Sequence, residues 1–99
     1  MNQLNILPKE VKDKLEQGLK LNIIDVREDE EVAEGMIPGA KHIPLGELPA
    51  RHQEIEQTDE VILVCRSGNR SGKAQQYLDM LGLKNLKNME GGMLEWHKL

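Results

Sequence analysis

The stretch Val61–Lys73 reads VILVCRSGNRSGK and contains Cys65, the only cysteine of the chain. Residues 61–64 are four consecutive β-formers and predict a buried strand, whereas residues 71–81 are typical of a helix. Cys65 would then lie at the carboxyl end of a strand and face the amino terminus of the following helix. In open α/β sheets this crevice is where ligands bind.

Residues 66–70 form the predicted loop between that strand and helix. Gly68 permits a positive φ, Asn69 tolerates it, and Ser71 is a natural helix N-cap, so successive N–H groups can point at one anion. Unpaired amides, the helix dipole and the cations Arg66, Arg70 and Lys73 should lower the pKa of the Cys65 thiol below about 8.5. The alternative is a cysteine that simply packs as a small buried hydrophobe. Because burial alone predicts neither the arginines nor the glycine, a reaction site is favoured.

The rest of the chain alternates between strand-like and helix-like segments. Further strands are predicted at residues 4–6, 21–26, 41–43 and 85–87, and helices at residues 8–18, 30–34 with Asp29 as cap, 45–55, and after Gly91-Gly92. Met93 and Trp96 of the last helix are expected to pack in the core. This alternation predicts an α/β fold with a mainly parallel central sheet of about five short strands and helices on both faces.

Length and composition limit the function classes. The 99 residues predict one small domain, 1–99, and a net charge of −4 argues against general nucleic-acid binding. No apolar run approaches the ~18 residues of a membrane span, and residues 1–5 lack the pattern of a signal peptide, so we expect a cytoplasmic protein without a membrane partner. A single cysteine cannot form an internal disulfide, and the histidines have no paired ligand spacing, so no metal site is expected; they are His42, His52 and His97.

Three segments resemble the signatures of one protein family, the rhodaneses, which are sulfurtransferases. Residues 24–28 (IDVRE) with residues 34–40 (EGMIPGA) and Ile43-Pro44 look like the amino-terminal signature, residues 64–71 (VCRSGNRS) like the active-site loop, and residues 90–92 with Trp96 like the carboxyl-terminal signature. The resemblance covers nearly the whole chain and implies a single-domain, three-layer rhodanese-like fold. Met36 replaces a histidine often found in the family, and Val32 an aromatic residue.

The resemblance also implies a reaction and its residues. The Cys65 thiolate would take the outer sulfur of a donor such as thiosulfate, and the loop residues Arg66, Ser67, Gly68, Asn69 and Arg70 would hold the resulting persulfide. A thiol or cyanide would then accept the sulfur, with no cofactor. Arg70 would orient the loop or bind the anionic donor, and Arg66 would attract anions. Asp25 and Arg27 are interpreted as mainly structural; for Arg27 the alternative is an ordinary solvated charge, and an aspartate beside the loop could pair with a loop arginine.

Two other functions compete with this one. A thiolate in a basic cradle also suits a phosphatase or an arsenate reductase, but those loops follow a Cys-x5-Arg pattern, one residue longer than the six residues from Cys65 to Arg70. The second alternative is a persulfide carrier in a sulfur relay, which would receive sulfur from a partner protein and deliver it onward. The acidic segment 28–34 would offer such a partner a docking face, unless it is only a solvated surface.

Overall fold

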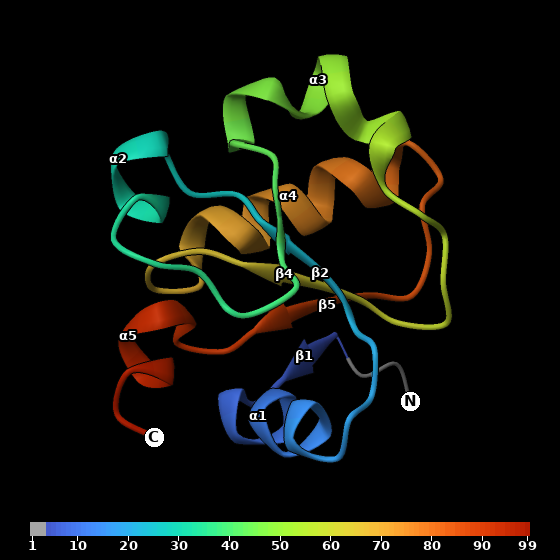
Figure 1. The fold of residues 1–99 in the computed structure, drawn as a ribbon. Helices are drawn as coiled ribbons and strands as arrows, with labels where there is room; N and C mark the ends of the chain where they lie inside the picture. The colour runs from blue at the N-terminus through green and yellow to red at the C-terminus, as the bar shows by residue number, and fades with distance from the viewer. Residues whose placement is uncertain (1–3) are drawn as a thin grey trace.

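The computed structural model describes residues 4–99, and its centre is a five-stranded sheet in which every neighbouring pair is parallel (Figure 1). The strand order is β1-β5-β4-β2-β3. The strands are β1 (Asn5–Ile6), β2 (Asn22–Asp25), β3 (Lys41–His42), β4 (Val61–Val64) and β5 (Leu86–Met89). The predicted α/β class and parallel sheet are therefore confirmed.

Helices cover both faces of this sheet. In Figure 1, α1 and α5 lie below the sheet, and α3 and α4 lie above it. The helices are α1 (Pro8–Glu16), α2 (Asp29–Val32), α3 (Leu48–Arg51), α4 (Asn69–Met80) and α5 (Gly92–Trp96), with 3-10 turns at Leu45–Glu47 and His52–Glu54. The result is the three-layer arrangement expected from alternating strands and helices.

Strand β4 divides the aliphatic core into two clusters. Its residues alternate, with Val61, Leu63 and then Cys65 in the cluster that contains α4, and Ile62 and Val64 in the cluster that contains α1 and α5. All four strand residues are fully buried, which explains why a continuous apolar run marks this strand in the sequence. As predicted, Met93 is buried and Trp96 packs against the second cluster.

Several predicted boundaries differ from the structure. Helix α4 begins at Asn69 rather than at residue 71, because Gly68 takes a left-handed conformation (φ 99°) and occupies the N-cap position predicted for Ser71. Similarly, Glu28 rather than Asp29 is the N-cap of α2. The helix predicted at 45–55 is broken into three short turns, since Pro49 lacks the N–H that a continuous helix needs.

The carboxyl ends of β2 and β4 lie side by side at the point where the connections leave in opposite directions. From β2 the chain proceeds to the edge strand β3, whereas from β4 it proceeds to β5 on the other side. Asp25 pairs with Val64 in the sheet, and the amide of Val26 donates to the carbonyl oxygen of Val64 at 2.9 Å. Open α/β sheets bind ligands at such a switch point, and Cys65 directly follows it.

Candidate active site

Cys65 lies beneath its own loop, with two hydrogen-bond donors at its sulfur. The backbone N–H of Gly68 donates to Sγ at 3.0 Å, and the hydroxyl oxygen of Ser71 lies 3.2 Å from Sγ. The cysteine residue has no exposed surface in this conformation. The loop and the first turn of α4 therefore each place one hydrogen-bonding group against the sulfur.

These contacts decide the ionisation of the thiol. Burial raises the pKa of Cys65, but hydrogen bonds from the Ser71 hydroxyl and from the backbone N–H groups of Ser71, Gly68 and Ser67 outweigh it, so the net pKa is lowered. The lowered pKa agrees in direction with the prediction from the sequence, and the backbone amides of the loop contribute to it. Arg66 and Lys73 are exposed, and the largest contributions that lower the pKa of Cys65 come from these hydrogen bonds.

Asn88 of β5 forms hydrogen bonds with both residues that contact the sulfur, Gly68 and Ser71. Its Nδ2 donates to the carbonyl oxygen of Gly68 at 3.0 Å, and its Oδ1 forms a short hydrogen bond with the Ser71 hydroxyl. Sequence reasoning missed this residue, because an asparagine in a short strand carries no pattern of its own. Ser71 contacts the sulfur through its buried side chain and is not the N-cap of α4.

The amino terminus of α5 fixes the beginning of the loop. The N–H groups of Met93 and Leu94 donate to the carbonyl oxygens of Cys65 and Arg66 at 2.8 and 3.0 Å. This approach requires a glycine at position 92, where φ is +58° and a Cβ atom would overlap both of those carbonyl groups. The Gly91-Gly92 segment thus serves the loop directly, which the sequence indicated only through family resemblance.

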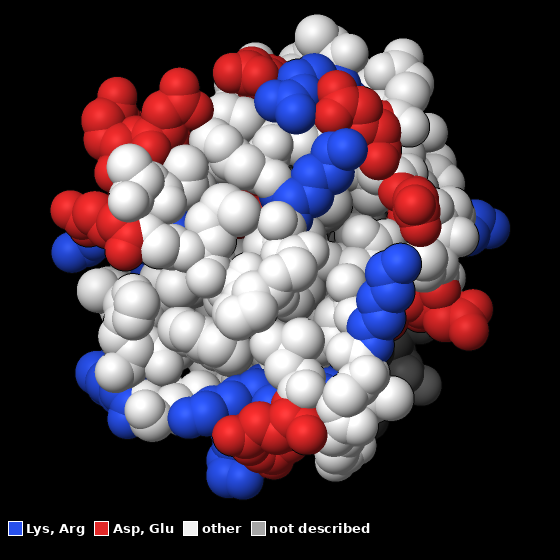
Figure 2. Space-filling model, in the orientation of Figure 1, with Lys and Arg blue, Asp and Glu red and all other residues white. Residues whose placement is uncertain are grey.

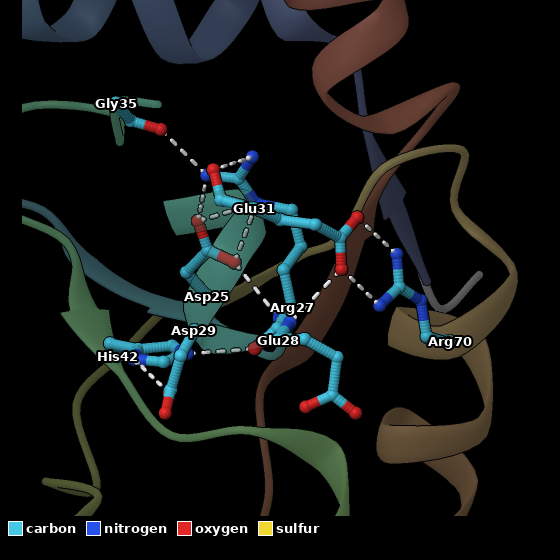
Figure 3. Close-up of polar contacts among 8 residues, drawn as sticks. All are labelled: Asp25, Arg27, Glu28, Asp29, Glu31, Gly35, His42 and Arg70. Carbon is cyan, nitrogen blue, oxygen red and sulfur yellow. Dashed lines mark hydrogen bonds and ion pairs between the residues drawn. The ribbon is translucent and has the colours of Figure 1, made fainter. Parts of the chain in front are cut away.

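The Arg70 side chain points toward Glu31 of α2 (Figure 3). Its Nη1 and Nη2 donate to the two carboxylate oxygens of Glu31 at 2.6 and 2.7 Å, and this bidentate pair is about one-third exposed or less on each side. The hydrogen bonds from Arg70 hold the pKa of Glu31 at about 2. The pair joins the end of the loop to α2.

Asp25 and Arg27 form a second, buried ion pair beneath this one. Arg27 Nη2 donates to Asp25 Oδ2 at 2.8 Å, and the guanidinium also donates to the carbonyl oxygens of Glu31 and Gly35. Arg27 is only 5% exposed, so the alternative of a solvated charge is wrong. The suggested pairing of an aspartate with a loop arginine is also wrong, because Asp25 bonds Arg27 and the loop arginine bonds Glu31. Buried charges of this kind require such partners.

The remaining loop residues face solvent. Arg66, Ser67 and Asn69 are exposed, and Arg66 has no ion pair among residues 4–99. Arg66 is thus an exposed cation directly after Cys65. Within the same residues, no group of three or more His, Cys, Asp or Glu side chains could hold a metal ion.

The chain matches the family model described as "Rhodanese-like domain" over residues 7–99. It belongs to the rhodanese-like family. The family predicted from the three signatures is thus confirmed, and the rhodanese-like fold is confirmed by a solved neighbour. That neighbour, a rhodanese-like domain protein from Staphylococcus aureus, superimposes with a TM-score of 0.85 at 39% identity, covering 93% of this chain and 89% of the other.

Two relatives from Bacillus subtilis carry functional names. "Putative sulfurtransferase YtwF" is 49% identical over 86 residues, which are 87% of this chain and 82% of that protein. "Putative sulfur carrier protein YrkF" is 42% identical over 85 residues, which are 86% of this chain but only 46% of that longer protein. Relatives of this rhodanese-like domain are therefore named for sulfur transfer and for sulfur carriage. Among residues 4–99, no helix is long and apolar enough to cross a membrane.

Proposed function

We propose that this rhodanese-like domain is a sulfurtransferase that moves a sulfane sulfur through a persulfide on Cys65. The observation that carries the proposal is the convergence of the Gly68 N–H and the Ser71 hydroxyl on Cys65 Sγ. Donors that are already in place can stabilise the attacking thiolate and then the charge on the bound persulfide. The family and the names of its relatives support the same chemistry.

The first half-reaction loads Cys65. With thiosulfate as the simplest donor, Cys65–S⁻ attacks the outer sulfur, the S–S bond of thiosulfate breaks with its electron pair on the departing group, and sulfite leaves. The charge is −3 on both sides, because Cys65–S–S⁻ and SO₃²⁻ replace Cys65–S⁻ and S₂O₃²⁻. Arg66 is the exposed cation that would meet the arriving anion.

The second half-reaction removes the transferred sulfur from Cys65. Cyanide attacks the outer sulfur of the Cys65 persulfide to form thiocyanate, or a thiolate attacks it to form a new persulfide, and the Cys65 thiolate is regenerated. Such covalent catalysis needs neither a metal nor an organic cofactor. We propose that the reaction takes place in the cytoplasm, with a thiol or a protein of a sulfur relay as the acceptor.

Steady-state kinetics test this proposal. The rate of thiocyanate formation is measured while thiosulfate and cyanide are varied together, for wild type and for Cys65→Ser. A two-step covalent reaction gives parallel double-reciprocal lines, and Cys65→Ser should show no turnover while retaining its thermal unfolding temperature. Intersecting lines, or wild-type turnover in Cys65→Ser, would contradict it.

A persulfide carrier is the second candidate, favoured by the similarity to a relative named as a sulfur carrier. The same Cys65 persulfide would form, but it would be loaded and discharged by partner proteins. The exposed acidic side chains of α2 and its ends would then be a docking surface; they are Glu28, Asp29, Glu30 and Glu34. Slow turnover of thiosulfate together with fast exchange of sulfur between Cys65 and a protein persulfide would favour the carrier over the enzyme.

A further inference from the structure

Glu31 neutralises Arg70, the arginine at the end of the loop that follows Cys65. The Arg70 guanidinium is held by both carboxylate oxygens of Glu31, at 2.6 and 2.7 Å. The Glu31 bond raises the pKa of Arg70 first of all, and a smaller contribution comes from the charge of Cys65. Arg70 is therefore near enough to interact with the Cys65 thiolate, yet its charge is already matched by a carboxylate.

The Glu31 carboxylate is fixed in place and cannot easily move away. Its Oε1 also accepts the backbone N–H of Glu28 at 3.0 Å, in the capping box of α2. Arg27 donates to the backbone carbonyl oxygens of Glu31 and Gly35 and is anchored to Asp25 in the core. Figure 3 shows these side chains as one connected group from Asp25 to Arg70. A networked, bidentate pair of this kind is stronger than an ordinary surface ion pair.

The surroundings add negative rather than positive charge. Figure 2 shows acidic side chains gathered over α2, where Asp29, Glu30 and Glu34 are exposed. On the loop itself, Arg66 is the cation without an ion pair among the described residues. A dianion that approaches Cys65 thus meets Arg66 as the unpaired cation of the loop, whereas the charge of Arg70 is cancelled by Glu31. The attraction that this cancellation removes grows in proportion to the negative charge of the donor.

We propose that Glu31 is a specificity-determining residue that disfavours dianionic sulfur donors and leaves the site suited to thiol persulfides, R–S–S–H. This inference rests on the proposed sulfur transfer and names its donor class. In the loading step the Cys65 thiolate attacks the terminal sulfur of R–S–S–H, the S–S bond breaks, and R–S⁻ leaves with the electron pair. Cys65–S–S–H and R–S⁻ carry the same total charge of −1 as the reactants, so no oxidant or reductant is needed.

The test compares two donors in wild type, Glu31→Gln and Glu30→Gln. Glu31→Gln keeps the shape and one acceptor for Arg70 but removes the charge, whereas Glu30→Gln removes an equal charge from the exposed side of the same helix. The second-order rate constant for loading Cys65 is measured by quenched intact-mass analysis with thiosulfate and with the persulfide of 2-mercaptoethanol. The quantity compared is the ratio of the two rate constants.

We expect the thiosulfate-to-persulfide ratio to rise about tenfold in Glu31→Gln, and much less in Glu30→Gln, at low ionic strength. The rise should shrink as salt is added. A variant that merely loosens the loop would slow both donors and leave the ratio unchanged. An unchanged ratio, or an equal rise in both variants, would overturn the role of Glu31 while leaving the proposed sulfur transfer intact. Failure of wild type to load from either donor would instead overturn the sulfur transfer itself.

Discussion

The side chain of Asn88 donates a hydrogen bond to the carbonyl oxygen of Gly68 at 3.0 Å, joining strand β5 to the loop that surrounds Cys65. Its Oδ1 is bonded to the Ser71 hydroxyl at the same time. Ser71 has one hydroxyl hydrogen and two neighbours that can accept it, Asn88 Oδ1 and Cys65 Sγ. When Cys65 is a thiolate the hydrogen can point to Sγ, and when Cys65 is a thiol the hydrogen can return to Asn88. Asn88 therefore links the position of the loop to the ionisation of the sulfur.

Asn88→Ala should slow sulfur transfer, whereas a variant that is destabilised to a similar extent elsewhere should not. The substitution leaves Gly68 and Ser71 without their common partner and should lower the free energy of unfolding by about 1–3 kcal/mol. Asn22→Ala is a matched control at the far end of the sheet, because Asn22 Nδ2 also makes two hydrogen bonds, to Glu56 and Thr58. We expect similar losses in urea unfolding but a lower transfer rate only in Asn88→Ala. Equal transfer rates in the two variants would contradict the role of Asn88.

Ser71→Ala should raise the pKa of Cys65. The Ser71 hydroxyl stabilises the charged form of Cys65, so its loss disfavours the thiolate and less thiolate would be present at neutral pH. The measurement is the rate of Cys65 alkylation by iodoacetamide as a function of pH. Ser67→Ala is the control, since the Ser67 side chain is exposed and only its backbone N–H serves the sulfur. A pH profile that is identical in Ser71→Ala and wild type would show that the hydroxyl does not stabilise the thiolate.

Gly92→Ala should destabilise the protein far more than Gly82→Ala. Both glycines have positive φ, +58° and +93°, but a Cβ atom at position 82 would meet open space. Gly82→Ala should thus cost about 1–2 kcal/mol for its conformation alone. Gly92→Ala adds overlap with the carbonyl groups of Cys65 and Arg66, for which overpacking costs of roughly 1–3 kcal/mol are typical. Urea unfolding measures both, and equal losses would contradict the close approach of α5 to the loop.

The Glu31–Arg70 pair should contribute to stability in a pH-dependent way. The pKa of Glu31 falls from 4.5 to about 2 on folding, so the folded state favours the ionised carboxylate. This contribution is fully present above about pH 4.5 and is lost as the pH falls toward 2. The difference in unfolding free energy between wild type and Glu31→Gln should therefore shrink over that interval. A difference that stays constant from pH 6 to pH 2 would indicate that the pair does not stabilise the fold.

The sequence predicts the fold well because hydrophobic burial dominates it. Residues 61–64 are apolar on both sides, so they can only be a central strand, and this places Cys65 at the edge where ligands bind. The position of the glycine-containing loop, directly after this strand, is predicted by the same pattern. The start of α4 at Asn69, two residues earlier than predicted, is not. A left-handed Gly68 can begin a helix without a side-chain cap, and residue preferences favour Ser71 instead.

Partners of charged and polar side chains could not be predicted in this way. Glu31 and Arg70 are 39 residues apart, and only the folded chain brings α2 beside the loop. Asn88 and Ser71 meet because β5 lies next to β4 in the sheet. Three cations between residues 66 and 73 suggest an electropositive cradle, but Arg70 is matched by a carboxylate from another segment. Charge patterns along a sequence therefore predict attraction to anions less well than apolar patterns predict strands.

Intact mass after exposure to a sulfur donor tests the central proposal most directly. Purified protein is mixed with thiosulfate or with the persulfide of 2-mercaptoethanol, freed of excess donor, and weighed by mass spectrometry. A persulfide at Cys65 would add one sulfur, roughly 32 Da, which cyanide removes and which Cys65→Ser does not acquire. An unchanged mass with both donors, or the same gain in Cys65→Ser, would contradict sulfur transfer through Cys65.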